Sequence, residues 1–272
     1  MNKLKLATII GLSFILIGCF ESRKNTEQLC KANPALRCEL LNVDDGQCRL
    51  PRTDLIWHRF DLIKTPSDEN KIKEYHILAD YEKCLTLAAQ IQPLTQTERK
   101  SKRFTTVVHV NEEQERIVAE LKQSTTPQAL YFLWSQEGDE TARRSFLQLE
   151  GTPALETAEM QYALATFYTS RDAIKTIQLL HRSLELSNGK NTNVEVIKSL
   201  ASLNLQQNRK ELAYIWTQVA QAFDVKTAAK KNNVLLYGFT EDKYQQLDDI
   251  AEQVHDAIKD GKYQASIIRK TW

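Results

Sequence analysis

Glycine is scarce in this 272-residue chain, where it occurs 8 times, about 3% of residues against a usual share near 7%. Proline occurs only 6 times. Loops that hold a phosphate, a dinucleotide or a serine nucleophile need glycine at fixed positions, and the chain has no G-x-S-x-G, glycine-rich phosphate loop, dinucleotide fingerprint or H-E-x-x-H segment. The common enzyme classes therefore lose most of their support, and the composition favours long helices with few turns.

The chain also lacks an excess of charge of either sign. Its formal net charge is +1, and loss of Lys3 and Lys5 with an N-terminal signal would bring it close to −1. A near-neutral chain without a long basic run argues against nucleic acid as the main partner. The longest apolar run, from Leu6 to Gly18, has about 13 residues, whereas a membrane-spanning helix needs about 20.

At the N-terminus the basic residues Lys3 and Lys5 precede the apolar run, which is the order found in secretory signals. The apolar run ends in Leu16-Ile17-Gly18-Cys19, which resembles the lipobox of bacterial lipoproteins. The resemblance implies that residues 1–18 are removed, that Cys19 carries acyl chains and that the chain is a membrane-anchored lipoprotein. Because Phe20 follows rather than Asp, it also implies sorting to the periplasmic face of the outer membrane. An ordinary secretory signal with an incidental cysteine is the alternative.

Four further cysteines stand near the N-terminus, at Cys30, Cys38, Cys48 and Cys84. Export and an even count predict two disulfides, for which three pairings are open. Zinc binding is less favoured because no C-x-x-C pair occurs, and free thiols remain the other alternative. Residues 19–27 are read as the lipidated cysteine and its tether, and residues 28–110 as a cysteine-rich cap followed by helices.

Helical spacing of apolar residues predicts helices over 53–65, from the N-cap Ser67 to Pro93, over 112–123, and a final helix over 240–261 with Thr240 as N-cap. Residues 96–110 are interpreted as a connection, because 104–110 alternates like a short strand or an extended link. The segment Trp57-His58-Arg59-Phe60-Asp61 mixes aromatic and ionisable groups. We interpret it as an amphipathic helix that packs Phe60 and leaves its charges outside.

Three helix-turn-helix units follow, over 127–153, 158–186 and 194–224. Ala142, Thr176 and Ala213 occupy equivalent places in the second helices, at spacings close to the roughly 34-residue period of tetratricopeptide repeats, which these units resemble. Asn204 departs from the pattern, where an aromatic residue is usual. A generic helical bundle is the alternative. The predicted fold is therefore all-α, a repeat array over 111–272 with a disulfide-stapled N-terminal cap.

The mature chain, including the segment from Arg52 to Phe60, also resembles an uncharacterised family of Gram-negative lipoproteins. That resemblance implies no activity. We predict no cofactor, no metal and no catalytic residue, because the histidines are scattered: His58, His76, His109, His181 and His255.

Two functions are weighed for this chain. The favoured one is a non-enzymatic scaffold that binds an envelope protein or peptide through a groove of the repeats. The repeat geometry implied by the tetratricopeptide resemblance places its concave positions at Glu159, Tyr162, Thr166, Thr169, Glu195, Lys198, Ser202 and Gln206. The alternative is a cell-wall-directed hydrolase with a site near Trp57 and His58. Ordinary solvent-facing side chains are the other interpretation of the eight repeat positions.

Overall fold

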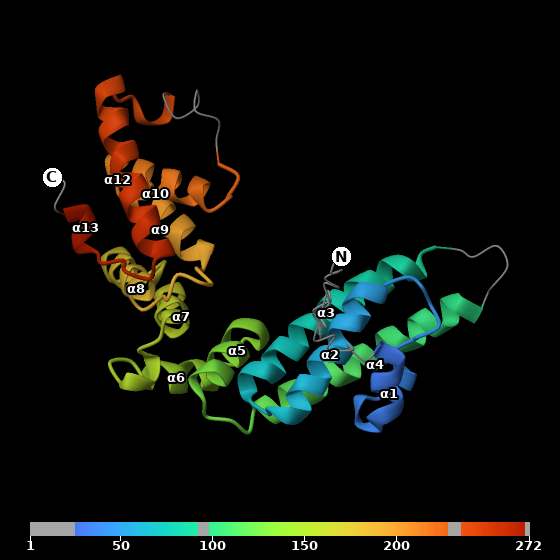
Figure 1. The fold of residues 1–272 in the computed structure, drawn as a ribbon. Coiled ribbons are helices and arrows are strands. Elements are labelled where there is room, and N and C mark those ends of the chain that lie inside the picture. The colour runs from blue at the N-terminus through green and yellow to red at the C-terminus, as the bar shows by residue number, and fades with distance from the viewer. Residues whose placement is uncertain (1–24, 92–97, 228–234, 270–272) are drawn as a thin grey trace, which may run out of the picture. The chain divides into compact units, whose positions relative to one another are not determined.

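The computed structural model describes residues 25–91, 98–227 and 235–269 (Figure 1). Within these ranges the regular elements are all helices and no residue lies in a strand, which confirms the predicted all-α fold. None of the helices described there has the length and apolar character that crossing a membrane requires. The chain divides into two compact units: unit 1 comprises residues 1–66 and 73–114, and unit 2 comprises residues 67–72 and 115–272.

Unit 1 begins with a short cap, residues 25–48, in which one helix and two 3-10 turns follow each other. These are α1 (Thr26–Ala32), η1 (Pro34–Leu36) and η2 (Cys38–Leu40). Three long helices follow the cap: α2 (Arg49–Lys64), α3 (Asp68–Ala89) and α4 (Glu98–Leu121). The first turn of α3 and the last turns of α4, from residue 115, are assigned to unit 2. The predicted break at Pro66 and the predicted N-cap are both confirmed, since the Ser67 hydroxyl accepts a hydrogen bond from the Asn70 amide at 3.1 Å.

The connection predicted over 96–110 is wrong, because α4 runs through nearly all of it. The buried face of α4 carries polar residues at helical spacing, Arg103, Thr106, His109 and Glu113, beside the apolar Val110. Apolar periodicity alone therefore misses the helix, and the alternation over 104–110 does not reflect a strand.

The predicted orientation of α2 is also wrong. His58 and Arg59 are buried, as is Arg52 about two turns earlier, whereas Phe60 is only half-buried and Ile63 is exposed. The interior of unit 1 satisfies these arginines with carboxylates and backbone carbonyls, which lets charged residues occupy the buried face.

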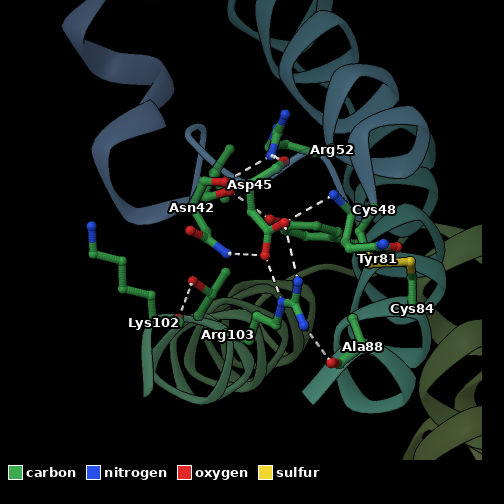
Figure 2. Close-up of polar contacts among 12 residues, drawn as sticks. Asn42, Asp45, Cys48, Arg52, Tyr81, Cys84, Ala88, Lys102 and Arg103 are labelled. Atoms are coloured by element: carbon green, nitrogen blue, oxygen red, sulfur yellow. Dashed lines mark hydrogen bonds and ion pairs between the residues drawn. A yellow bond between two sulfur atoms is a disulfide. The ribbon is translucent and has the colours of Figure 1, made fainter. Parts of the chain in front are cut away.

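Both predicted disulfides are present. Cys30 pairs with Cys38 inside the cap. Cys48 pairs with Cys84, which ties the end of the cap to the last third of α3 (Figure 2). The second bridge closes a separation of 36 residues and the first only 8, so the second constrains the unfolded chain more strongly.

Unit 2 contains the three predicted helix pairs, and each pair is present. They are α5 (Pro127–Glu137) with α6 (Glu140–Gln148), α7 (Ala158–Tyr168) with α8 (Ala173–Glu185), and α9 (Val194–Gln206) with α10 (Lys210–Ala222). The short turn η3 (Pro153–Leu155) joins the first pair to the second. Side chains cap most of these helices: Thr126, Asp139, Thr157, Asp172 and Asn193 each accept a hydrogen bond from a backbone amide of the first turn.

The final predicted helix is α12 (Glu241–Lys259), with Thr240 as N-cap and Gly261 in the left-handed conformation beyond its end. It is not the last element, because a short helix, α13 (Ser266–Arg269), follows. The turn before α9 packs closely on the end of α12. A Cβ atom at Gly189 would lie 2.2 Å from the Lys259 carbonyl oxygen, so only glycine fits there. The core beneath includes the fully buried Trp216 and Leu247.

Candidate functional site

The residues predicted to bind a partner lie along the first helices of the repeat pairs. Seven of the eight are exposed and Tyr162 is half-buried. We call the following set the first-helix face: Tyr131 on α5; Glu159, Tyr162, Thr166 and Thr169 on or just after α7; and Glu195, Lys198, Ser202 and Gln206 on α9. The positions alternate with buried residues such as Leu164 and Leu200, which face the core. A polar row over a packed apolar row is the expected pattern of a solvated helix face.

The structure places residues of the three first helices within electrostatic reach of one another. Tyr131 on α5 interacts with the Thr166 side chain on α7 and lies within electrostatic reach of Glu159. Tyr162 on α7 is in turn influenced by Tyr131 and by Glu195 on α9. Burial raises the pKa of both tyrosines, so both hydroxyls stay protonated and can donate a hydrogen bond at neutral pH.

Tyr131 is a member of this face that the predicted set did not include. A positional rule finds it: Tyr131, Tyr162 and Lys198 each stand four residues after the first residue of their helices, Pro127, Ala158 and Val194. The first helix pair, α5 with α6, matches the repeat pattern weakly, so the sequence alone does not show that Tyr131 is equivalent to Tyr162 and Lys198.

The charge on the first-helix face is uneven. Lys198 pairs with Glu195 at 2.7 Å, and both side chains are about half exposed. Partial burial, and then the nearby carboxylate of Glu69 in the first turn of α3, raise the pKa of Glu159. Two neighbouring carboxylates favour the approach of a positive group.

The hydroxyls of Thr166 and Thr169 bond to backbone carbonyls of α7. Thr166 donates to the Ala163 carbonyl at 2.7 Å and Thr169 to the Ala165 carbonyl at 3.0 Å. Ser202 and Gln206 are exposed along α9. The interactions that link separate helices therefore concentrate at Tyr131, Glu159, Tyr162 and Thr166.

A second group of functional-looking residues is buried in unit 1 (Figure 2). The Arg103 guanidinium donates from Nε to Asp45 Oδ2 at 2.5 Å, from Nη2 to Asp45 Oδ1 at 3.2 Å and from Nη1 to the Ala88 carbonyl at 2.6 Å. Arg52 Nη1 donates to the carbonyls of Asn42 and Asp45, both at 2.7 Å. Tyr81 donates to the Leu41 carbonyl at 2.5 Å. The hydrogen bond from Arg103 lowers the pKa of Asp45 against the opposing effect of burial.

Further along the three long helices, a second buried arginine holds two carboxylates. Arg59 Nε donates to Glu74 at 2.7 Å and its Nη2 to Glu113 at 3.0 Å, while Arg37 bonds the other oxygen of Glu113 at 2.6 Å. Burial lowers the pKa of the neighbouring His109, which keeps this imidazole neutral near pH 7. Carboxylates bound in this way brace the three helices, and we assign this network a structural role.

The segment proposed for the alternative hydrolase lies on α2. His58 is buried, and Trp57 is half-buried with its ring edge-on to Phe60 at 6.2 Å. A hollow of about 410 Å³ opens beside the cap, and its lining on α2 includes Arg49, Arg52, Thr53 and Ile56. In the residues that the structure describes, no group of three or more His, Cys, Asp or Glu side chains is placed to hold a metal ion. Cys19 lies outside the described residues.

A family model, described as "Protein of unknown function (DUF2989)", matches residues 16–218. The chain belongs to this family. The part shared with DUF2989 begins ahead of Cys19, takes in the cap and the three long helices, and ends inside α10. It therefore includes both buried arginine networks and the whole first-helix face. Comparison with the curated proteins and with the solved structures found no match.

Proposed function

We propose that this protein is an envelope lipoprotein anchored through Cys19, and that its first-helix face binds a protein or peptide partner without catalysing a reaction. The observation that supports the proposal is a row of side chains along successive first helices, in which Tyr131 hydrogen-bonds with Thr166 and Tyr162 lies within electrostatic reach of Tyr131 and Glu195. Stacked helix pairs with a continuous polar row are the arrangement that repeat proteins use to hold a peptide.

A tetratricopeptide-like arrangement of unit 2 is part of the proposal. It is supported by three consecutive helix pairs, by their spacing close to 34 residues and by small or polar buried residues where two helices approach closely. Ala142, Thr176 and Ala213 are all buried, as the repeat requires at that place.

Charge reversal tests the binding face. The double variant Glu159→Lys with Lys198→Glu should lose cross-links to envelope partners in cells, while each substitution changes the free energy of unfolding by less than about 0.5 kcal/mol. The matched control reverses two exposed charges elsewhere in unit 2, Glu252→Lys with Lys210→Glu, and should keep the cross-links. Unchanged cross-linking in the folded Glu159 and Lys198 variant would remove the first-helix face from consideration.

The anchor is tested separately at Cys19. The Cys19→Ser variant should lose labelling by a fatty-acid analogue and accumulate as the unprocessed precursor, because the lipobox-like segment Leu16-Ile17-Gly18-Cys19 ends at the residue that is modified. A radiolabelled or clickable palmitate followed by gel analysis measures both effects. A Cys19→Ser protein that is still labelled and processed would contradict the anchor and leave the binding face untouched.

A further inference from the structure

Exposed apolar residues gather at one end of unit 1. Among the described residues, twelve large apolar side chains are exposed, and seven of them form a set that we call the cap end: Leu40, Val43, Leu50, Leu87, Ile91, Phe104 and Val108. Leu50 is 71% exposed and Phe104 is 65% exposed. Isolated exposed apolar residues are common on soluble proteins, but a concentration of this kind marks an interaction site.

Covalent and polar links place these residues at the same end. The Cys48–Cys84 disulfide and the bonds of Arg103 to Asp45 and Ala88 join the end of the cap, the end of α3 and the start of α4 (Figure 2). Each link has an exposed apolar residue beside it in the chain: Leu50 follows Cys48 by two residues, Leu87 precedes Ala88, and Phe104 follows Arg103.

The remaining members of the cap end follow from the same links. Val43 precedes Asp45 by two residues, and Leu40 precedes Leu41, whose carbonyl accepts from Tyr81. Val108 lies four residues, about one helical turn, beyond Phe104 on α4, and Ile91 lies two residues beyond the end of α3. All members of the cap end therefore lie within a few residues of these links along the chain.

Cations accompany the apolar residues of α4 and Leu50, whereas the exposed acidic residues Glu39 and Asp44 stand beside Leu40 and Val43 in the cap. Arg99, Lys100 and Lys102 are exposed in the first turns of α4, against one acidic residue, Glu98, in the same stretch. Arg49 is exposed beside Leu50. Lysine is depleted at protein–protein interfaces, whereas apolar residues mixed with lysine and arginine are typical of surfaces that bind anionic phospholipid. The cationic start of α4 thus favours an anionic lipid surface over a protein partner at this part of the cap end.

The short segment between Cys19 and the cap agrees with a lipid bilayer as the partner. Seven residue steps separate Cys19 from Thr26, the first residue of α1, and they span at most about 25 Å. If Cys19 is lipidated, as the proposed function on which this argument rests requires, the cap cannot lie farther than that from the bilayer. Two contacts joined by a short tether reinforce one another, because the second binds at a high effective concentration.

We infer that the cap end of unit 1 binds the surface of an anionic phospholipid bilayer and forms a second contact beside the lipid on Cys19. Leu50 and Phe104 enter the headgroup region, and Lys100 and Lys102 contact lipid phosphates. The cap end is thereby a membrane-docking surface, and its neighbour, the buried Arg103 network, holds the three segments that compose it in register.

The test uses the mature chain from residue 20 onwards, secreted with a cleavable signal that directs no lipidation. Its sedimentation is measured with vesicles of phosphatidylethanolamine that contain about a quarter phosphatidylglycerol, and with vesicles of a neutral lipid alone. The expected result is partition onto the anionic vesicles that weakens as salt is added. Absence of partition, or equal partition onto neutral vesicles, would overturn the inference.

Two variants and one control locate the surface. Leu50→Ser with Phe104→Ser should weaken the partition about tenfold, and Lys100→Glu with Lys102→Glu should weaken it about fivefold or more for each charge. Ile174→Ser, which changes a residue of unit 2 that is 63% exposed, should leave it unchanged. Thermal melting shows that all three remain folded. Equal partition of the three variants, or protein cross-links from a photoreactive residue at position 104, would contradict a lipid partner.

The assay separates this inference from the proposed function. The secreted chain carries no lipid, so vesicle binding through the cap end does not depend on modification of Cys19. If the secreted chain does not bind vesicles while Cys19 of the full chain is still labelled by fatty acid, only the docking surface is contradicted. Vesicle binding by a chain whose Cys19 is never labelled would support the surface and contradict the anchor.

Discussion

Replacement of Arg103 by methionine should lower the free energy of unfolding by about 3–5 kcal/mol, the cost of leaving one member of a buried ion pair without its partner. Arg103 and Asp45 are 4% and 3% exposed, so water cannot replace the lost bonds. The variant leaves the Asp45 carboxylate with only the amide of Gln47 at 3.0 Å and the side chain of Asn42 at 3.4 Å, and it frees the Ala88 carbonyl. Denaturant unfolding of the oxidised mature chain measures the loss.

A matched control uses an exposed arginine on the same helix. Arg116 forms an ion pair with Glu120 at 2.5 Å, with both side chains about 40% exposed, and Arg116→Met should cost less than about 1 kcal/mol. The double variant Asp45→Leu with Arg103→Met removes both charges and should be more stable than Arg103→Met alone. A loss below about 1 kcal/mol in Arg103→Met would show that the pair does not hold the cap to α4.

The pH dependence gives an independent check with a definite sign. Arg103 holds the pKa of Asp45 below its ordinary value, so this carboxylate stabilises the folded chain above about pH 4 and loses that effect as the pH falls through its folded pKa. In Arg103→Met the carboxyl stays buried and loses the guanidinium bound to it, which raises its pKa, and protonation on acidification removes the cost of the buried charge. The difference in stability between wild type and variant should therefore be largest at neutral pH. It should begin to shrink above about pH 4, as the variant's carboxyl takes up a proton, and shrink further below about pH 4, as the wild type loses its ion pair.

The helix pairs of unit 2 were predictable because local signals agree there. Apolar spacing, capping residues such as Asp172 and Thr240, and left-handed glycine at the helix ends all mark the same boundaries. The helix expected over 240–261 occupies Glu241–Lys259, a difference of one or two residues at each end. These features act within a few residues of sequence, so they can be read from the chain without knowledge of its folding.

Unit 1 was predicted less well because its interior is held by long-range charge pairs. Arg103 and Asp45 are 58 residues apart, and Arg59 and Glu113 are 54 apart. Reading helices from apolar spacing assumes that arginine and glutamate face solvent. This assumption assigns the buried charged faces of α2 and α4 to the surface, and it makes residues 96–110 look like a connection. Ion pairs between residues so far apart in the chain depend on the fold, and no pattern in the neighbouring sequence indicates them.

The first-helix face was predicted in part. The repeat spacing identified the positions on α7 and α9, whose exposure agrees with the prediction, while the weakly matching first pair concealed Tyr131. The proximity of Glu159 to Glu69 could not have been predicted, because it depends on the first turn of α3 belonging to unit 2. The binding role of the first-helix face stays a prediction until cross-linking tests it.

The two disulfides should contribute unequally. Removing the bridge that closes 36 residues, with Cys48→Ala and Cys84→Ala, should cost about 4 kcal/mol by the loop-entropy relation, against about 2.5 kcal/mol for Cys30→Ala with Cys38→Ala, whose loop is 8 residues. The backbone at Cys48 is left-handed, with φ 57°, and alanine bears the same strain there as cysteine. The measured difference therefore reports the bridge and not the backbone. Equal losses from the two double variants would contradict the ranking.

The long bridge and the buried arginine pair should also depend on each other. Cys48 follows Asp45 by three residues, and Cys84 precedes Ala88, the other acceptor of Arg103, by four. Without the bridge, the end of the cap can move away from α3, and the Asp45 carboxylate can reach water instead of Arg103. Loss of Arg103 should then cost less than it does in the bridged chain, so the combined variant should be more stable than the two separate losses predict, by more than about 0.5 kcal/mol. Strict additivity in denaturant unfolding would show that the bridge and the ion pair fasten the cap independently.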